Sequence, residues 1–302
     1  MEIYKNHMER HGAQFPRTLA LFLLMTGLSV AITACQKGDS QGQEASITER
    51  MAEEHKNDEP RSNESAQQPS VAVETEQVTY GKASGNELTG YFARPEGKEA
   101  NNLPGLIVIH EWWGLNDNIR MMTRRLAGEG YQALAVDLYN GNTASDPSQA
   151  RKLMQKAMKD SETGIVNLKE AHRFLAEERN TNKTGVIGWC FGGGWTLQAA
   201  LAMPEKLDAA NIYYGRLETD PKRLDDIETP ILGIFGEEDD GIPPKTVRRF
   251  ETVLDSLGKQ ASIHIYEGAD HAFANPSGNS YDKQAAEDAW QKTVSFFGEH
   301  LK

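Results

Sequence analysis

A cysteine flanked by glycines is the first residue in this sequence whose surroundings indicate chemistry. Cys190 lies in the segment GWCFG, residues 188–192, which follows an apolar run and precedes a stretch with helical periodicity. Glycines two residues before and after a nucleophile permit the sharp strand-to-helix turn that exposes it. The start of a helix also favours a thiolate and a developing oxyanion. The alternative is a buried structural cysteine, which is common in protein cores.

An acid and a histidine follow Cys190 in the order that such a nucleophile needs. Asp239 follows the apolar run ILGIF, and His271 follows the run IHIY. Loops at strand ends are where ligands and catalytic groups gather in open parallel sheets. We therefore predict a triad of Cys190, Asp239 and His271 for nucleophilic acyl transfer. Three neighbouring carboxylates remain alternative acids: Glu237, Glu238 and Asp240.

Short apolar runs alternate with amphipathic stretches from residue 74 onward. The expected strands are Glu74–Tyr80, Leu88–Ala93, Leu106–His110, Ala133–Asp137, Thr184–Gly188, Ala209–Tyr214, Ile231–Phe235 and Ser262–Tyr266. The expected helices are Asn116–Gly128, Pro147–Lys159, Thr163–Glu178, Gly192–Ala202, Pro244–Leu257 and Tyr281–His300. This alternation predicts an α/β fold, with a mostly parallel central sheet and helices on both faces, over residues 74–302.

Residues 1–34 have the layout of a secretory signal peptide. Basic residues precede an uncharged stretch, residues 18–36, that contains the tetrapeptide ITAC ending at Cys35. The tetrapeptide resembles the lipobox of bacterial lipoproteins, which implies cleavage before Cys35 and lipidation of that cysteine. Gln36 follows instead of Asp, which implies sorting to the outer membrane, facing the periplasm. The alternative for this stretch is a single transmembrane anchor.

The composition of the remaining chain narrows the class of protein. Residues 35–73 form a polar segment with few apolar residues, and we expect the part after the lipidated Cys35 to be a disordered tether. The 302 residues carry a formal net charge of -12, which disfavours sequence-independent nucleic-acid binding. Two cysteines cannot build a disulfide framework. A core must therefore stabilise the globular part.

Six ordered motifs resemble the dienelactone hydrolase family of the α/β-hydrolase superfamily over nearly the whole of residues 75–302. They are HEWWGLNDNIR, VDLYNG, GWCFGG, YYGRL, FGEEDDGIP and YEGADHAFA. The resemblance implies an α/β-hydrolase fold and a cofactor-free hydrolase of carboxylic ester or lactone bonds, similar to carboxymethylenebutenolidase. It implies that Cys190 is the nucleophile, His271 the general base and Asp239 the acid that orients the imidazole.

The same resemblance implies roles for the segment HEWWG. Glu111 would contact the resting thiol, and the backbone N–H groups of Trp112 and Phe191 would form the oxyanion hole. Glu111 ends the apolar run LIVIH, and the alternative for it is a capping or surface carboxylate. His110 has no second histidine at helical spacing, which favours a hydrogen-bonded core residue over a metal ligand. No metal is expected.

Two departures from the family concern the substrate. Similar enzymes that act on dienelactone have an arginine four residues after the histidine, where this chain has Asn275. The arginine-rich patch before the middle helix is reduced to Arg151. We therefore expect a small ester or lactone other than the anionic dienelactone. The candidate substrate-binding residues are Trp113, Tyr213 and Arg216, with Trp112 and Trp189 as further aromatic wall residues.

The favoured hypothesis is a membrane-tethered hydrolase that binds a small-molecule substrate and no nucleic acid. One alternative is an envelope lipoprotein that binds a ligand or partner on the same fold without turnover. Another is a thiol redox protein, because an activated cysteine can be oxidised by peroxide. Lipidation of Cys35 would leave Cys190 without a resolving thiol in the chain.

Overall fold

The computed structural model describes residues 68–97 and 103–302. The predicted signal peptide, Cys35 and most of the predicted tether lie outside the described residues. Pro69 and Ser70, at the end of the predicted tether, lie against Gly128, and the Ser70 hydroxyl donates to the Gly128 carbonyl at 2.8 Å. The folded domain therefore includes these residues.

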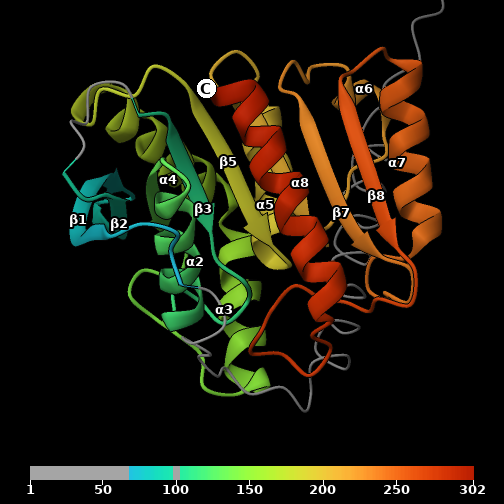
Figure 1. The fold of residues 1–302 in the computed structure, drawn as a ribbon, viewed down its shortest axis with the longest axis horizontal. Helices are drawn as coiled ribbons and strands as arrows, with labels where there is room; N and C mark the ends of the chain where they lie inside the picture. Colours follow the sequence, from blue (N-terminus) through green and yellow to red (C-terminus); the bar gives the residue numbers. More distant parts are fainter. Residues whose placement is uncertain (1–67, 98–102) are drawn as a thin grey trace, which may run out of the picture. The chain divides into compact units, whose positions relative to one another are not determined.

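Within the described residues, eight strands form one sheet in the order β1-β2-β4-β3-β5-β6-β7-β8 (Figure 1). The strands are β1 Val73–Ala83, β2 Asn86–Pro95, β3 Gly105–Ile109, β4 Gln132–Val136, β5 Thr184–Trp189, β6 Ala209–Tyr213, β7 Ile231–Gly236 and β8 Ala261–Tyr266. The β1–β2 and β2–β4 pairs are antiparallel, and all pairs from β4 to β8 are parallel. The predicted mostly parallel α/β sheet is confirmed.

The central strands are mostly apolar because helices cover both faces of the sheet. Every residue of β3, β4, β5, β6 and β7 is buried, whereas β8 at the edge is only half-buried. A strand buried on both faces needs no polar alternation, and these strands read as continuous aliphatic runs. The same runs made the strands predictable from the sequence.

The helices pack on the sheet in the expected chain order. They are α2 Asp117–Gly128, α3 Pro147–Lys159, α4 Ser161–Arg173, α5 Phe191–Ala202, α6 Pro221–Leu224, α7 Pro244–Ser256 and α8 Lys283–Leu301. In Figure 1, α8 crosses in front of the sheet and α5 lies behind it. No helix within residues 68–97 and 103–302 has the length and apolar composition that a membrane span requires.

Side-chain caps explain where several helices begin. Asn116, Asp146 and Asp282 each accept a hydrogen bond from a backbone N–H in the first turn of α2, α3 and α8. The short helix α6 was not predicted. Its start signal is Asp220 followed by Pro221 at the first helical position, which is a cap and a helix-compatible proline in sequence.

The single helix predicted over residues 163–178 is two segments in the structure. After α4, residues Phe174–Glu178 form a π-helix, in which the Arg179 N–H donates to the Phe174 carbonyl at 3.0 Å. This five-residue spacing widens the last turn. Hydrophobic periodicity does not reveal such a change, because both helix types keep Phe174 and Leu175 buried.

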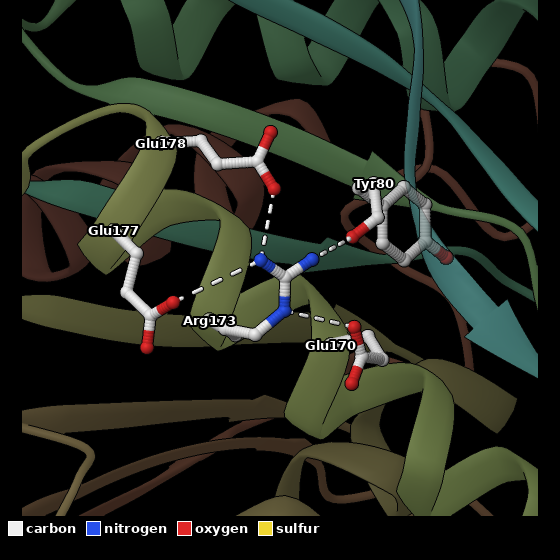
Figure 2. Close-up of polar contacts among 5 residues, drawn as sticks. All are labelled: Tyr80, Glu170, Arg173, Glu177 and Glu178. Carbon is white, nitrogen blue, oxygen red and sulfur yellow. Dashed lines mark hydrogen bonds and ion pairs between the residues drawn. The ribbon is translucent and has the colours of Figure 1, made fainter.

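Arg173 ties this junction to the edge of the sheet (Figure 2). Its guanidinium donates to Glu170 and Glu178, each at 2.9 Å, and to the backbone carbonyl of Tyr80 on β1 at 3.0 Å. The arginine side chain is 36% exposed, so water competes for these contacts.

Candidate active site

Cys190 occupies a strained turn between β5 and α5. Its backbone has φ 56° and ψ −116°, a region that L-residues with side chains rarely adopt. The Cys190 N–H donates to the Tyr213 carbonyl at 3.0 Å, and its own carbonyl accepts from Gly194 at 3.2 Å. Bonds to β6 and α5 therefore hold the turn, and such strain clusters at functional sites.

Two glycines let the backbone close around this turn. A Cβ at Gly188 would lie 2.3 Å from the Gly192 carbonyl oxygen, and a Cβ at Gly192 would lie 2.3 Å from the Ile109 carbonyl oxygen. No side chain fits at either position. The start of α5 is thereby pressed against the end of β3, whose register pairs Ile109 with Gly188.

His271 and Asp239 form a buried pair at the ends of β8 and β7. The His271 Nδ1 lies 2.7 Å from Asp239 Oδ2, and neither side chain is exposed. The second carboxylate oxygen, Oδ1, accepts from the Ile242 N–H at 2.6 Å. The other three candidate acids are exposed: Glu237, Glu238 and Asp240. The structure therefore brings Asp239, and none of its neighbours, to the imidazole.

The electrostatics of this pair favour its ionised form. Burial alone lowers the pKa of His271, but the charges of Asp239 and Cys190, with hydrogen bonds to both, raise that pKa well above 6.5. Burial alone raises the pKa of Asp239, yet the His271 charge and hydrogen bonds from His271, Ile242 and Gly241 lower it. The ring therefore faces a carboxylate on one side and the thiol on the other.

Glu111 is a buried carboxylate held by two amides. Its side-chain oxygen Oε2 accepts from Asn275 Nδ2 at 2.8 Å and from Asn118 Nδ2 at 3.4 Å. The side-chain oxygen Oδ1 of Asn275 in turn accepts from the Ser277 N–H at 2.8 Å. Both the amide nitrogen and the amide oxygen of Asn275 are therefore hydrogen-bonded to protein groups. Asn118, the second donor to Glu111, was not predicted from the sequence.

The aromatic ring of Tyr214 lies beside the catalytic candidate His271. The Tyr214 ring lies 5.2 Å from the His271 ring, and its buried hydroxyl has no hydrogen-bond partner among the described residues. Burial, with nearby charges including Glu111 and Cys190, raises the Tyr214 pKa well above 10. Tyr214 also has φ 34°, which marks it as constrained. The motif YYGRL contains both Tyr213 and Tyr214, but only the structure shows that Tyr214 is the one whose ring contacts His271.

The three predicted substrate-binding residues do not share one environment in the structure. Trp113 is buried and packs on Trp112 with ring centroids 4.9 Å apart. The hydroxyl of Tyr213 lies 2.6 Å from the Thr293 hydroxyl on α8, so its polar end is directed into the core. Arg216 lies beside Gly194 in the first turn of α5. The structure thus places Arg216 near the start of α5 but keeps the Tyr213 hydroxyl away from His271.

The two residues predicted to supply oxyanion N–H groups lie on opposite sides of the β3–α5 contact. Phe191 is the first residue of α5, so the helix offers its N–H no acceptor. Trp112 follows Glu111 after the end of β3, and its side chain is 1% exposed. Within the described residues, no group of three His, Cys, Asp or Glu side chains is placed to hold a metal ion.

A model of the dienelactone hydrolase family matches residues 88–301. The chain belongs to the dienelactone hydrolase family. It is therefore a hydrolase of the dienelactone hydrolase type, which acts on ester or lactone bonds. The match runs from Leu88 within β2 to the end of α8 and includes every residue of the site described above.

Known relatives cover the same part of the chain. The protein "Protein usf" of Aquifex pyrophilus is 35% identical over 225 residues, covering 72% of this chain and 96% of that protein. A "Putative carboxymethylenebutenolidase" of Saccharolobus solfataricus is 32% identical over 250 residues, covering 71% and 95%. The crystal structure titled "Putative Dienelactone Hydrolase" from Klebsiella pneumoniae has a TM-score of 0.68 and 28% identity, covering 76% of this chain and 99% of that chain.

Proposed function

We propose that this hydrolase cleaves uncharged carboxylic esters or lactones through a thiol triad of Cys190, His271 and Asp239. The observation that carries the proposal is the fully buried His271–Asp239 contact of 2.7 Å, combined with the strained turn that presents Cys190. An acid that fixes one ring nitrogen directs the other nitrogen at the nucleophile. The family membership supplies the reaction class, and the geometry supports this assignment of roles.

In the first step, the thiolate sulfur of Cys190 attacks the carbonyl carbon and forms a carbon–sulfur bond. The carbonyl electrons move onto the oxygen, and the N–H groups of Trp112 and Phe191 stabilise that oxyanion. When the carbonyl reforms, the carbon–oxygen bond of the ester breaks. The imidazolium of His271 gives its proton to the leaving alkoxide, which leaves a thioester on Cys190 and a neutral imidazole.

In the second step, neutral His271 accepts a proton from water as the water oxygen attacks the thioester carbon. The tetrahedral oxyanion accepts hydrogen bonds from the same two N–H groups. Collapse expels the Cys190 thiolate and releases the carboxylic acid, so thiolate and imidazolium are restored. Asp239 keeps the imidazole orientation and compensates its positive charge throughout, since it accepts from Nδ1.

The preference for an uncharged substrate follows from what surrounds the thiol. Glu111 and Asp239 place two buried carboxylates in the site region, and both would repel a substrate carboxylate. The Asn275 amide is already bonded to Glu111 and to Ser277. Arg216 is the remaining candidate cation for an anionic substrate.

The test compares the chain from residue 36 onward with its Cys190→Ala variant on neutral aryl esters, neutral lactones and the anionic dienelactone. We expect turnover that disappears in Cys190→Ala and is at least about tenfold faster on neutral substrates, the effect of about 1.4 kcal/mol of repulsion. Circular dichroism confirms that both proteins are folded. Ligand binding without turnover by the folded wild type would support a binding lipoprotein instead, and faster dienelactone turnover would overturn the charge preference.

We also propose that the enzyme is tethered to the outer membrane through lipid on Cys35. The support is the sequence ITAC after a basic and apolar amino terminus, followed by Gln36. Acyl chains contribute about 0.8 kcal/mol per buried methylene, so several chains would anchor the protein stably. Labelling with radioactive palmitate should mark the wild type and not Cys35→Ala. Release of unlabelled wild type without detergent would overturn the tether.

A further inference from the structure

His110 is a fully buried histidine next to the site that the triad does not use. Its Nδ1 lies 2.6 Å from the Glu111 carbonyl oxygen, and its Nε2 lies 3.1 Å from the backbone nitrogen of Leu138. A carbonyl oxygen can only accept and a backbone N–H can only donate. His110 is therefore the neutral tautomer with its proton on Nδ1, and burial lowers its pKa in agreement.

The carbonyl that His110 holds belongs to the peptide unit of Trp112. The Glu111–Trp112 peptide bond is trans, so its C=O and N–H point in opposite directions. Fixing the Glu111 oxygen toward the His110 ring therefore fixes the Trp112 N–H on the other side. The Gly114 N–H also donates to the Glu111 oxygen, at 3.2 Å, which closes a turn over the same residues.

The His110 ring also contacts the residue that supplies the second oxyanion donor. It stacks on the Phe191 ring at a centroid distance of 5.7 Å and an interplanar angle of 22°. Behind it, the Tyr139 ring packs against the imidazole at 4.6 Å. One buried ring thus connects the loop after β4, the turn after β3 and the first residue of α5.

We propose that His110 is a positioning residue that sets both oxyanion donors, the Trp112 N–H by a hydrogen bond to the preceding carbonyl and the Phe191 N–H by stacking. The inference rests on the thiol acyl transfer proposed above. It assigns the imidazole no contact with substrate. His110 therefore affects the stabilisation of the oxyanion, which both steps of the reaction need. It does not affect the nucleophilicity of Cys190.

The test uses His110→Leu, which removes both hydrogen bonds, and His110→Asn, whose amide can keep a donor near the Nδ1 position. His172→Leu is the control, because His172 on α4 also has its Nε2 3.0 Å from a backbone carbonyl, that of Lys206, in an exposed contact. Three quantities are measured: kcat and KM on an aryl ester, and the rate of Cys190 alkylation by iodoacetamide. Alkylation develops no oxyanion, so it reports on the thiol alone.

We expect His110→Leu to lower kcat at least about tenfold, since loss of an oxyanion donor costs about 10² to 10³ and the Gly114 bond still holds the turn. KM and the alkylation rate should stay within about twofold, His110→Asn should recover part of kcat, and His172→Leu should match the wild type. An equal fall in alkylation and kcat, or no fall in kcat, would overturn the proposal.

A crystal structure of His110→Leu tests the geometry without relying on activity. The Glu111–Trp112 peptide should be rotated or present in two orientations, and the wild-type orientation should persist in His172→Leu. An unchanged peptide in His110→Leu would contradict the positioning role. Failure of the wild type to hydrolyse any ester would instead count against the proposed function, so the two failures are distinguishable.

Discussion

Two charge pairs in this hydrolase have almost the same length and opposite surroundings. His271 and Asp239 lie 2.7 Å apart with both side chains fully buried. Arg173 and Glu170 lie 2.9 Å apart at the surface, with side chains 36% and 30% exposed (Figure 2). The first pair contains a titratable imidazole beside the thiol, whereas the second joins a permanently charged guanidinium to a helix carboxylate.

The comparison teaches that burial, and not distance, decides what a charge pair does. At the surface, water and salt weaken the attraction, and each partner can find another. In the interior, removal of one partner leaves the other without compensation. The Arg173 cluster therefore contributes modestly to holding α4 on β1, while the His271–Asp239 pair controls the proton on which the proposed reaction depends.

Breaking the buried pair should have the largest effect. Asp239→Asn keeps the size of the side chain but removes the charge that orients and stabilises protonated His271. We expect kcat/KM on an aryl ester to fall by at least about 10²-fold. Asp240→Asn is the matched control, because its carboxylate is exposed one residue away. Full activity in Asp239→Asn with loss in Asp240→Asn would show that the acid is Asp240.

Adding a charge at Asn275, whose buried amide donates to Glu111, should have the next largest effect. Asn275→Asp replaces the donor to Glu111 with a second carboxylate in the same buried contact. We expect the free energy of unfolding to fall by about 1–3 kcal/mol at pH 7, measured by urea denaturation. Asn279→Asp adds the same charge at an exposed position of the same loop and should change stability little. Equal losses of stability in the two variants would contradict a stabilising role for the buried Asn275–Glu111 hydrogen bond.

The pH dependence of stability should sharpen the comparison further. The pKa of His271 is raised above 6.5, so its contribution is complete below pH 6.5 and is lost as pH rises through the raised pKa. Asp239, with its pKa lowered below 3.8, stays ionised at pH 6. The stability difference between wild type and Asp239→Asn should therefore be largest near pH 6 and should shrink as the pH is raised. If the stability difference grew as the pH was raised, the charge of protonated His271 would not be what Asp239 stabilises.

Breaking the exposed pair should have the smallest effect. Arg173→Ala removes contacts with Glu170, Glu178 and the Tyr80 carbonyl. We expect the free energy of unfolding to fall by less than about 1 kcal/mol at low salt, with the difference shrinking in high salt. kcat and KM should not change. Lys152→Ala provides the baseline for loss of an exposed cation on a helix.

The main features of the fold were predictable because local patterns and tertiary burial agree in this chain. All eight strands were predicted to within a few residues, and the central ones were the clearest because strands buried on both faces are rich in aliphatic residues. The π-helix Phe174–Glu178 and the four-residue α6 were not predicted. In the first case, the hydrogen-bond spacing changes without a change in the apolar pattern. In the second, the helix is shorter than the windows in which periodicity is detectable.

The sequence alone determined the glycine-flanked turn at Cys190, the order of Cys190, Asp239 and His271, and the strands that these residues follow. Glycine spacing, chain order and apolar runs are local properties, and they can be read without knowing what packs where. Only the tertiary structure decided that Asn275 binds Glu111, that Tyr214 meets His271, and that His110 holds the Glu111 carbonyl. The first two contacts join residues more than fifty positions apart, and the third depends on the orientation of a buried ring. Chain packing sets both, and no local pattern encodes them.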